Sequence, residues 1–191
     1  AAMEEPSDAE LLRRHSAGDA QAFAQLYDRH DRKSFDYLRR LLHPADAATA
    51  EDLHQEVWLA VARASAQYDE SKARFVTWLF TIARNRVLDW QRQQGRAGWE
   101  LLQSAEALPD APRLQPPERV QAARMAEAVV EAVEALPLAQ REAFVLFSFD
   151  ELSLQEIAAL TKVPLETAKT RLRYARDALR QRLQAWRTAD V

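Results

Sequence analysis

The stretch SLQEIAALTKVPLETAKTRLRYARDALRQRL, residues 153–183, predicts two helices joined by a short turn. Ser153 and Glu156 have the spacing of a capping box, which begins a helix that runs to about Leu160. The turn is TKVP, and its proline is tolerated at the entry of the second helix because the first N–H groups of a helix have no partner within it. This order of elements is that of a helix-turn-helix unit.

The second predicted helix carries threonine, lysine and arginine between its apolar positions. Threonine and arginine near the start of such a helix can reach base edges, and lysine and arginine can hold phosphates. The predicted DNA contacts are Thr167, Lys169, Thr170, Arg171, Arg173, Tyr174 and Arg176. An ordinary helical hairpin with a basic face in solvent is the alternative. One feature counts against the helix-turn-helix: Lys162 occupies the turn position that often holds glycine, where we expect a positive φ at a cost of about 1 kcal/mol.

The rest of the 191-residue chain is also predicted to be helical. It contains only three glycines, is rich in helix-forming residues, and has no stretch that alternates as a strand would. Residues 104–118 contain four prolines and little apolar periodicity, which is typical of a linker. We therefore expect an all-α protein with a tail at 1–7, helical domains at 8–95 and 119–187, and a Pro-rich linker at 96–118.

Capping residues predict helix boundaries in the first domain. Ser7 and Asp19 can each cap a helix, and Pro44 can end the second of these helices. Thr49 followed by Asp52 has the spacing of a capping box and predicts the start of the third helix.

The net charge of −3 hides two basic segments. Residues 69–99 contain six basic and three acidic side chains, and residues 162–191 contain eight and three. The local field rather than the total charge governs binding to a polyanion. Each basic segment coincides with a motif, which favours nucleic-acid contacts over charges that are simply solvated.

Several classes of site have no support in the sequence. There is no cysteine, and the four histidines (His15, His30, His43 and His54) lack paired-ligand spacing, so we expect no metal site. There is no Gly-rich phosphate loop and no convincing nucleophile–base pair, so we expect neither a cofactor nor an enzyme. No apolar run reaches the length of a membrane span, and the acidic start does not resemble a signal peptide, so we expect a cytoplasmic protein.

The stretch FVTWLFTIARNRVLDWQRQQ, residues 75–94, mixes aromatic residues with arginines on one predicted helix. Phe75, Trp78, Leu79 and Ile82 have the spacing of a core stripe. Phe80 and Arg84 then lie on another face, near Val87, and need another role. A protein that opens duplex DNA needs apolar walls for unstacked bases and cations for phosphates. A purely structural role remains the alternative for Phe75 and Trp78.

Four segments in this order resemble bacterial RNA polymerase sigma factors of the extracytoplasmic-function (ECF) type. They are FAQLYDRHDRKSFDYLRRLL (23–42), AEDLHQEVWLAVARA (50–64), RFVTWLFTIARNRVLDWQR (74–92) and the stretch from ALPLAQREAFVL (135–146) through the helix-turn-helix. The resemblance covers nearly the whole chain outside the tail and the linker. It implies two helical domains, sigma region 2 and sigma region 4, and a transcription initiation factor that has no catalytic activity of its own.

The resemblance also implies partners and site residues. Core RNA polymerase would be bound through its β′ clamp helices and its β flap, with Asp52, Leu53, Gln55 and Glu56 at the β′ contact. The loop before residue 75 would capture a flipped base of the −10 element. The implied −10 contacts are Tyr68, Asp69, Lys72, Arg74, Trp78, Arg84, Asn85 and Arg86. The helix-turn-helix would read the −35 element, and an anti-sigma factor would hold the protein inactive.

Two other classes of protein remain open at the level of sequence. A helix-turn-helix repressor or response-regulator output domain would account for residues 137–187 but would leave DLHQE and WLFTIARN without a role. A helical adaptor that binds only proteins would leave the basic segments without one. Copurification with core polymerase separates the first class from a sigma factor, and salt-dependent DNA binding separates the second.

Overall fold

The computed structural model describes residues 5–42, 47–95, 122–149 and 151–188. Within these ranges the secondary structure is helical and contains no strand, which confirms the predicted all-α class. The chain divides into two compact units, residues 1–95 and 96–191, and each is described by itself. The predicted stop at Pro44 and the predicted linker lie outside the described residues.

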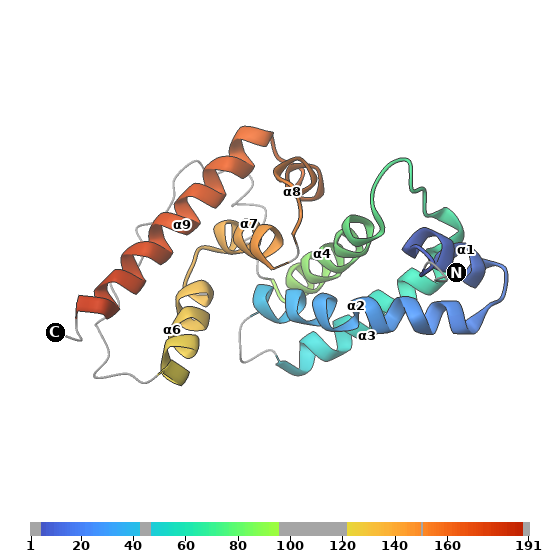
Figure 1. Ribbon diagram of the computed structural model, residues 1–191, viewed down its shortest axis with the longest axis horizontal. Coiled ribbons are helices and arrows are strands. Elements are labelled where there is room, and N and C mark those ends of the chain that lie inside the picture. The colour runs from blue at the N-terminus through green and yellow to red at the C-terminus, as the bar shows by residue number, and fades with distance from the viewer. Residues whose placement is uncertain (1–4, 43–46, 96–121, 150, 189–191) are drawn as a thin grey trace. The chain divides into compact units, whose positions relative to one another are not determined.

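The N-terminal unit is a bundle of helices (Figure 1). Its elements are α1 (Asp8–Ser16), α2 (Ala20–Leu41), α3 (Ala47–Ala64), the 3-10 turn η2 (Ser65–Gln67) and α4 (Phe75–Gln93). Helices α2, α3 and α4 contact one another pairwise, and α1 packs on α2 and on η2. The bundle therefore places the connection between η2 and α4 close to α1.

Two of the predicted caps are present in the N-terminal unit, and one predicted boundary is wrong. The Ser7 hydroxyl accepts a hydrogen bond from the amide of Glu10 at 3.2 Å, and Asp19 accepts bonds from two amides at the start of α2. Helix α3, in contrast, begins at Ala47, so Thr49 lies inside it. The helix continues backward past Thr49 because neither the preceding alanines nor the threonine opposes helical backbone.

The buried face of α4 differs from the predicted stripe. Phe80 is 1% exposed, its ring centroid lies 4.8 Å from that of Tyr37, and Val87 and Arg84 are also buried. Trp78 and Ile82, which were predicted to form the core, are only half-buried. Helix α4 contacts both α2 and α3, so its buried face is wider than the stripe that a single neighbour would cover. The separate face proposed for Phe80 and Arg84 was therefore wrong.

The C-terminal unit contains the predicted helix-turn-helix (Figure 1). Its described helices are α6 (Ala122–Glu134), α7 (Leu138–Ser148), α8 (Leu154–Thr161) and α9 (Leu165–Thr188), and α9 contacts the other three. The capping box is confirmed, because the Ser153 amide donates to Glu156 Oε2 at 2.8 Å and the Glu156 amide donates to Ser153 Oγ at 3.2 Å. Lys162 has φ 58° and ψ 44°, as its place in the turn predicted.

Candidate polymerase and nucleic-acid interfaces

Helix α3 presents three of the four predicted polymerase contacts to solvent. Asp52, Gln55 and Glu56 are exposed, whereas Leu53 is 5% exposed and packs into the bundle. Leu59, one turn farther along, is 54% exposed and was not among the predicted contacts. The outer face of α3 therefore combines carboxylates, an amide and an apolar side chain, which is a surface that can bind a basic partner.

A buried polar cluster fixes α3 against α2. The Trp58 indole N–H lies 3.1 Å from His54 Nε2 and 3.2 Å from Ser34 Oγ, and His54 Nε2 also lies 3.0 Å from the carbonyl of Asp31. Burial lowers the pKa of His54, since the charged imidazolium loses hydration, and this outweighs the opposing effects of the Asp31 carbonyl and of the Asp31 carboxylate charge. A neutral ring can accept from the indole at Nε2, which a doubly protonated ring cannot do.

We expect the N-terminal unit to lose stability as the pH falls from about 7.5 to about 5.5. The unfolded chain binds a proton at His54 more readily than the folded chain, whose His54 pKa is lowered, so acidification favours unfolding below the unfolded pKa. Urea unfolding of the wild-type chain and of His54→Leu at both pH values measures this effect. The variant should depend less on pH, and an equal dependence in the two proteins would show that His54 does not titrate on unfolding.

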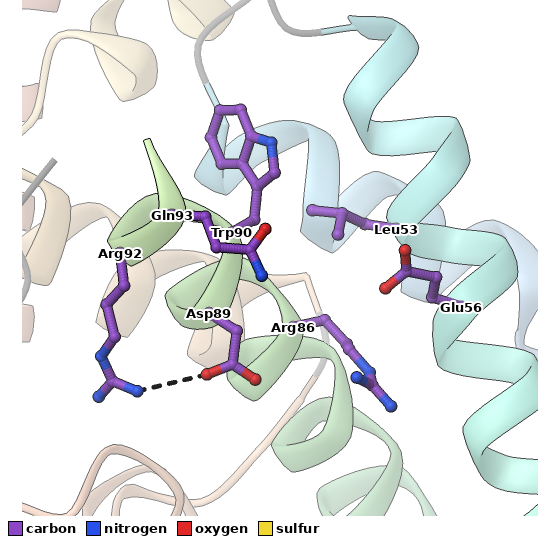
Figure 2. Close-up of a pocket in the computed structure, with 7 residues that line it drawn as sticks. All are labelled: Leu53, Glu56, Arg86, Asp89, Trp90, Arg92 and Gln93. Carbon is purple, nitrogen blue, oxygen red and sulfur yellow. Dashed lines mark hydrogen bonds and ion pairs between the residues drawn. The ribbon is translucent and has the colours of Figure 1, made fainter. Parts of the chain in front are cut away.

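A groove with a volume of about 380 Å³ lies between α3 and α4 (Figure 2). Its lining residues are Leu53, Glu56, Arg86, Asp89, Trp90, Arg92 and Gln93. The groove thus joins two predicted polymerase contacts to Arg86, a predicted DNA contact. Asp89, Trp90 and Gln93 were not among the predicted site residues, although they follow Arg86 by three, four and seven positions and so share its face of α4.

The loop from Tyr68 to Arg74 is held by its own hydrogen bonds. The Asp69 carboxylate accepts from the Ser71 amide at 2.9 Å and from the Ser71 hydroxyl at 2.6 Å, and these bonds lower the pKa of Asp69. The Tyr68 hydroxyl donates to the carbonyl of Ala73 at 3.0 Å, which closes the loop across its base. Lys72 is exposed and lies 3.8 Å from Asp69. The bond from the Asp69 carboxylate to the Ser71 amide is that of an Asx turn, which fixes the local course of the backbone.

Three aromatic rings stand where this loop meets α4. The Tyr68 ring lies 5.2 Å from Trp78 and 6.0 Å from Phe75, measured between centroids. Phe75 is buried, whereas Tyr68 and Trp78 are half-buried. Burial, followed by the charges of Glu70, Asp8 and Asp69, raises the pKa of Tyr68, so the phenol keeps its proton.

The remaining predicted −10 contacts differ in exposure. Asn85 and Arg74 are exposed and Arg86 is half-buried, so each can present polar atoms to a partner. Arg84 is 2% exposed, and its placement among core residues argues against a direct contact with DNA in this conformation. The role predicted for Arg84 at the −10 element therefore stays a prediction.

The predicted −35 residues divide between two flanks of α9. Lys169, Arg173 and Arg176 lie on one flank and, together with Arg180, which was not among the predicted contacts, line a shallow groove of about 250 Å³ beside Leu154. Thr167, Thr170 and Arg171 are half-buried on the other flank, next to the exposed Tyr174. The Arg176 guanidinium lies 4.9 Å from the Phe147 ring centroid, and Lys169 pairs with Glu166 at 2.8 Å. These contacts orient two of the cations of the basic flank.

Comparison of the chain with models of known protein families finds one match in each unit. Residues 26–97 match Sigma-70 region 2, and residues 126–179 match Sigma-70 region 4. The ECF RNA polymerase sigma factor RpoE of Cereibacter sphaeroides is 34% identical over 166 residues, which cover 86% of this chain and 88% of that protein. This chain belongs to the ECF family of RNA polymerase sigma factors. The family resemblance inferred from the sequence is confirmed.

Further relatives and solved structures agree with this assignment. The ECF RNA polymerase sigma factor SigW of Bacillus subtilis is 30% identical over 87% of this chain and 91% of its own length. The structure of CnrH in complex with the cytosolic domain of CnrY has the same fold, with a TM-score of 0.65 and 24% identity over 94% of this chain and 99% of CnrH. RpoE of Bartonella quintana, solved with the anti-sigma factor NepR, has a TM-score of 0.66 and 23% identity over 86% and 98% of the two chains.

Membership of this family sets the general function. The ECF sigma factor is a polymerase-associated transcription initiation factor and binds promoter DNA. The alternative of a repressor or response-regulator output domain is not favoured, because the N-terminal unit matches region 2 as well. None of the described helices has both the length and the apolar composition that crossing a bilayer requires.

Proposed function

We propose how the two units of this ECF sigma factor share the work of initiation. The outer face of α3 binds the β′ clamp helices of core polymerase, and the C-terminal unit meets the β flap. The loop at 68–74 and the exposed residues of α4 recognise and open the −10 element, and α9 reads the −35 element. Domains at 8–95 and 119–187, with a linker at 96–118, carry these roles. The protein acts in the cytoplasm and catalyses no reaction itself.

One observation carries the assignment of the N-terminal unit. The loop at 68–74, which is held by its own hydrogen bonds, and the half-buried rings of Tyr68 and Trp78 lie at the start of α4. Asn85 is exposed in the middle of the same helix, and the acidic face of the neighbouring helix α3 is also exposed. An unpaired base can stack on a ring and bond to the loop. The acidic face suits a basic partner surface on another protein. It does not suit DNA, because its carboxylates and the DNA phosphates are both negative and repel each other.

In vitro transcription with core polymerase on genomic fragments, with mapping of the start sites, tests the proposed function. We expect Asn85→Ala to reduce permanganate reactivity of thymines near the start site more than it reduces closed-complex binding, because Asn85 is exposed on α4 and bonds to a base only after opening. Gln25→Ala, an exposed amide on α2, serves as the control. Equal losses in both assays would indicate a general defect instead.

Binding by the C-terminal unit should depend steeply on salt. If the basic flank of α9 neutralises about four phosphates, the slope of log affinity against log salt should be near −3.6, or roughly a 150-fold loss between about 50 and 200 mM salt. Titration of a fragment spanning residues 119–187 with duplexes selected from a random pool measures this slope.

Two substitutions on α9 should have different effects. Arg173→Ala should lower the affinity for all duplexes and flatten the slope by about one unit. Arg171→Ala should cost about 1–3 kcal/mol on the selected sequence alone.

An anti-sigma factor is the proposed inhibitor, and it occludes the polymerase-binding face of α3. The related folds of CnrH and Bartonella quintana RpoE were each solved with a second protein, CnrY and NepR respectively. The exposed Leu59 beside Gln55 gives such a partner an apolar contact on this face. Competition between the inhibitor and core polymerase tests occlusion, and a stable ternary complex without mutual weakening would exclude it.

A further inference from the structure

Helix α1 is tied at its end to the turn that precedes the loop at 68–74, and at its start to α2, which contacts the helix that follows this loop. At its end, Ser16 Oγ lies 3.1 Å from Ser65 Oγ, in the 3-10 turn that leads into the loop. At its start, the Asp8 carboxylate accepts from His30 Nε2 at 2.9 Å, and the His30 ring lies 5.2 Å from that of Phe75, the first residue of α4. Helix α1 thus contacts the entry of the loop directly and is linked to its exit through His30 of α2.

Asp8 holds His30 in one orientation. Because a carboxylate only accepts, Nε2 of His30 must carry the proton in this bond. Arg29 Nη1 lies 3.1 Å from the other carboxylate oxygen and also donates to the carbonyl of Pro6 at 2.7 Å. Burial acts to raise the pKa of Asp8, but the hydrogen bonds and charges of His30 and Arg29 lower it, so the carboxylate stays ionised.

The path from Asp8 to the two half-buried rings consists of three successive contacts, the first of which is the hydrogen bond between Asp8 and His30. His30 packs on Phe75, and Phe75 packs at 6.0 Å on both Tyr68 and Trp78. The charge of Asp8 is also among those that raise the pKa of Tyr68. Because Phe75 contacts His30 and both half-buried rings, a tilt of the His30 ring would displace Phe75 and with it the rings of Tyr68 and Trp78.

We propose that Asp8 and His30 are positioning residues for recognition of the unpaired −10 base, acting on Tyr68 and Trp78 through Phe75. The inference rests on the proposed role of the loop. Asp8 and His30 do not themselves touch DNA; they set the angle between the rings, and hence the discrimination between bases. Helix α1 is in this sense part of the −10 reader.

The test uses holoenzyme made from the full chain and core polymerase. The holoenzyme captures strands from a random pool of single-stranded DNA 12-mers, and the captured strands are sequenced. The affinity of the holoenzyme for the selected strand is then compared with its affinity for strands in which the most strongly selected base is replaced. We expect Asp8→Asn to reduce this discrimination by about fivefold, which corresponds to ~1 kcal/mol. Binding to core polymerase should not change. Glu10→Gln removes the same charge from the same helix but breaks only the surface pair with Arg13, so it should have no effect.

Two further measurements distinguish positioning from loss of stability. In the full chain labelled with ¹³C-tyrosine, Asp8→Asn should shift the ring signal of Tyr68, assigned with Tyr68→Phe, whereas Glu10→Gln should not. The double variant Asp8→Asn/His30→Gln should lose no more discrimination between bases than whichever single variant loses more, because both residues act along one path. Additive losses, or an unmoved Tyr68 signal, would overturn the path through His30.

The outcome also separates this inference from the function on which it rests. If Tyr68→Ala removes discrimination and Asp8→Asn leaves it intact, α1 has no part in reading the base and only this inference fails. If Tyr68→Ala itself leaves discrimination intact, the loop is not the base-binding site and the proposed function of the loop fails.

Discussion

Gln55→Ala combined with Glu56→Lys should weaken binding to core polymerase by at least about 30-fold, which corresponds to ~2 kcal/mol. Both side chains are exposed on α3, so the fold should persist. The change removes an amide and places a cation where the proposed partner surface is basic. The attraction of the Glu56 carboxylate is lost and the introduced ammonium group adds repulsion, and both effects are larger when the interface excludes water.

The measurement is fluorescence-detected titration of core polymerase at two salt concentrations. Asp28→Lys, which makes the same type of charge reversal at an exposed site on α2, is the matched control and should bind nearly as well as the wild type. The defect of the double variant should shrink at high salt if charge dominates it. An unchanged affinity for core polymerase would remove α3 from the interface.

Phe80→Ala should destabilise the N-terminal unit by about 3–5 kcal/mol, the usual cost of emptying a buried phenylalanine site. Phe80 is 1% exposed and packs on Tyr37, whose ring is itself fully buried. The surrounding side chains come from different helices, so the cavity cannot close by a simple shift of one of them. Urea unfolding, followed by circular dichroism, gives the free energy.

Ile82→Ala is the control for this prediction. Ile82 is on the same helix but only half-buried, so its truncation should cost clearly less than that of Phe80. The opposite order would restore the sequence-based hypothesis, in which Ile82 belongs to the core and Phe80 to a DNA-binding face. A Phe80→Ala protein of normal stability that fails to open promoters would do the same.

The local features of the chain follow from the sequence alone. The caps at Ser7, Asp19 and Ser153 were predicted because each depends on a side chain and an amide only two or three residues away. The positive φ of Lys162 follows from the turn between two helices. The order of apolar stripes and turns was enough for the all-α class and the helix-turn-helix, since these patterns repeat with the period of the helix.

The burial of α4 and the layout of the interfaces needed the tertiary structure. Periodicity gives the direction of a buried face but not its width, which depends on how many helices pack against it; two neighbours bury Phe80 and Arg84 as well as Leu79. The groove that joins Glu56 to Trp90 and the path from Asp8 to Phe75 link residues 34 and 67 positions apart. No local rule relates such residues, because only the packing of helices brings them together.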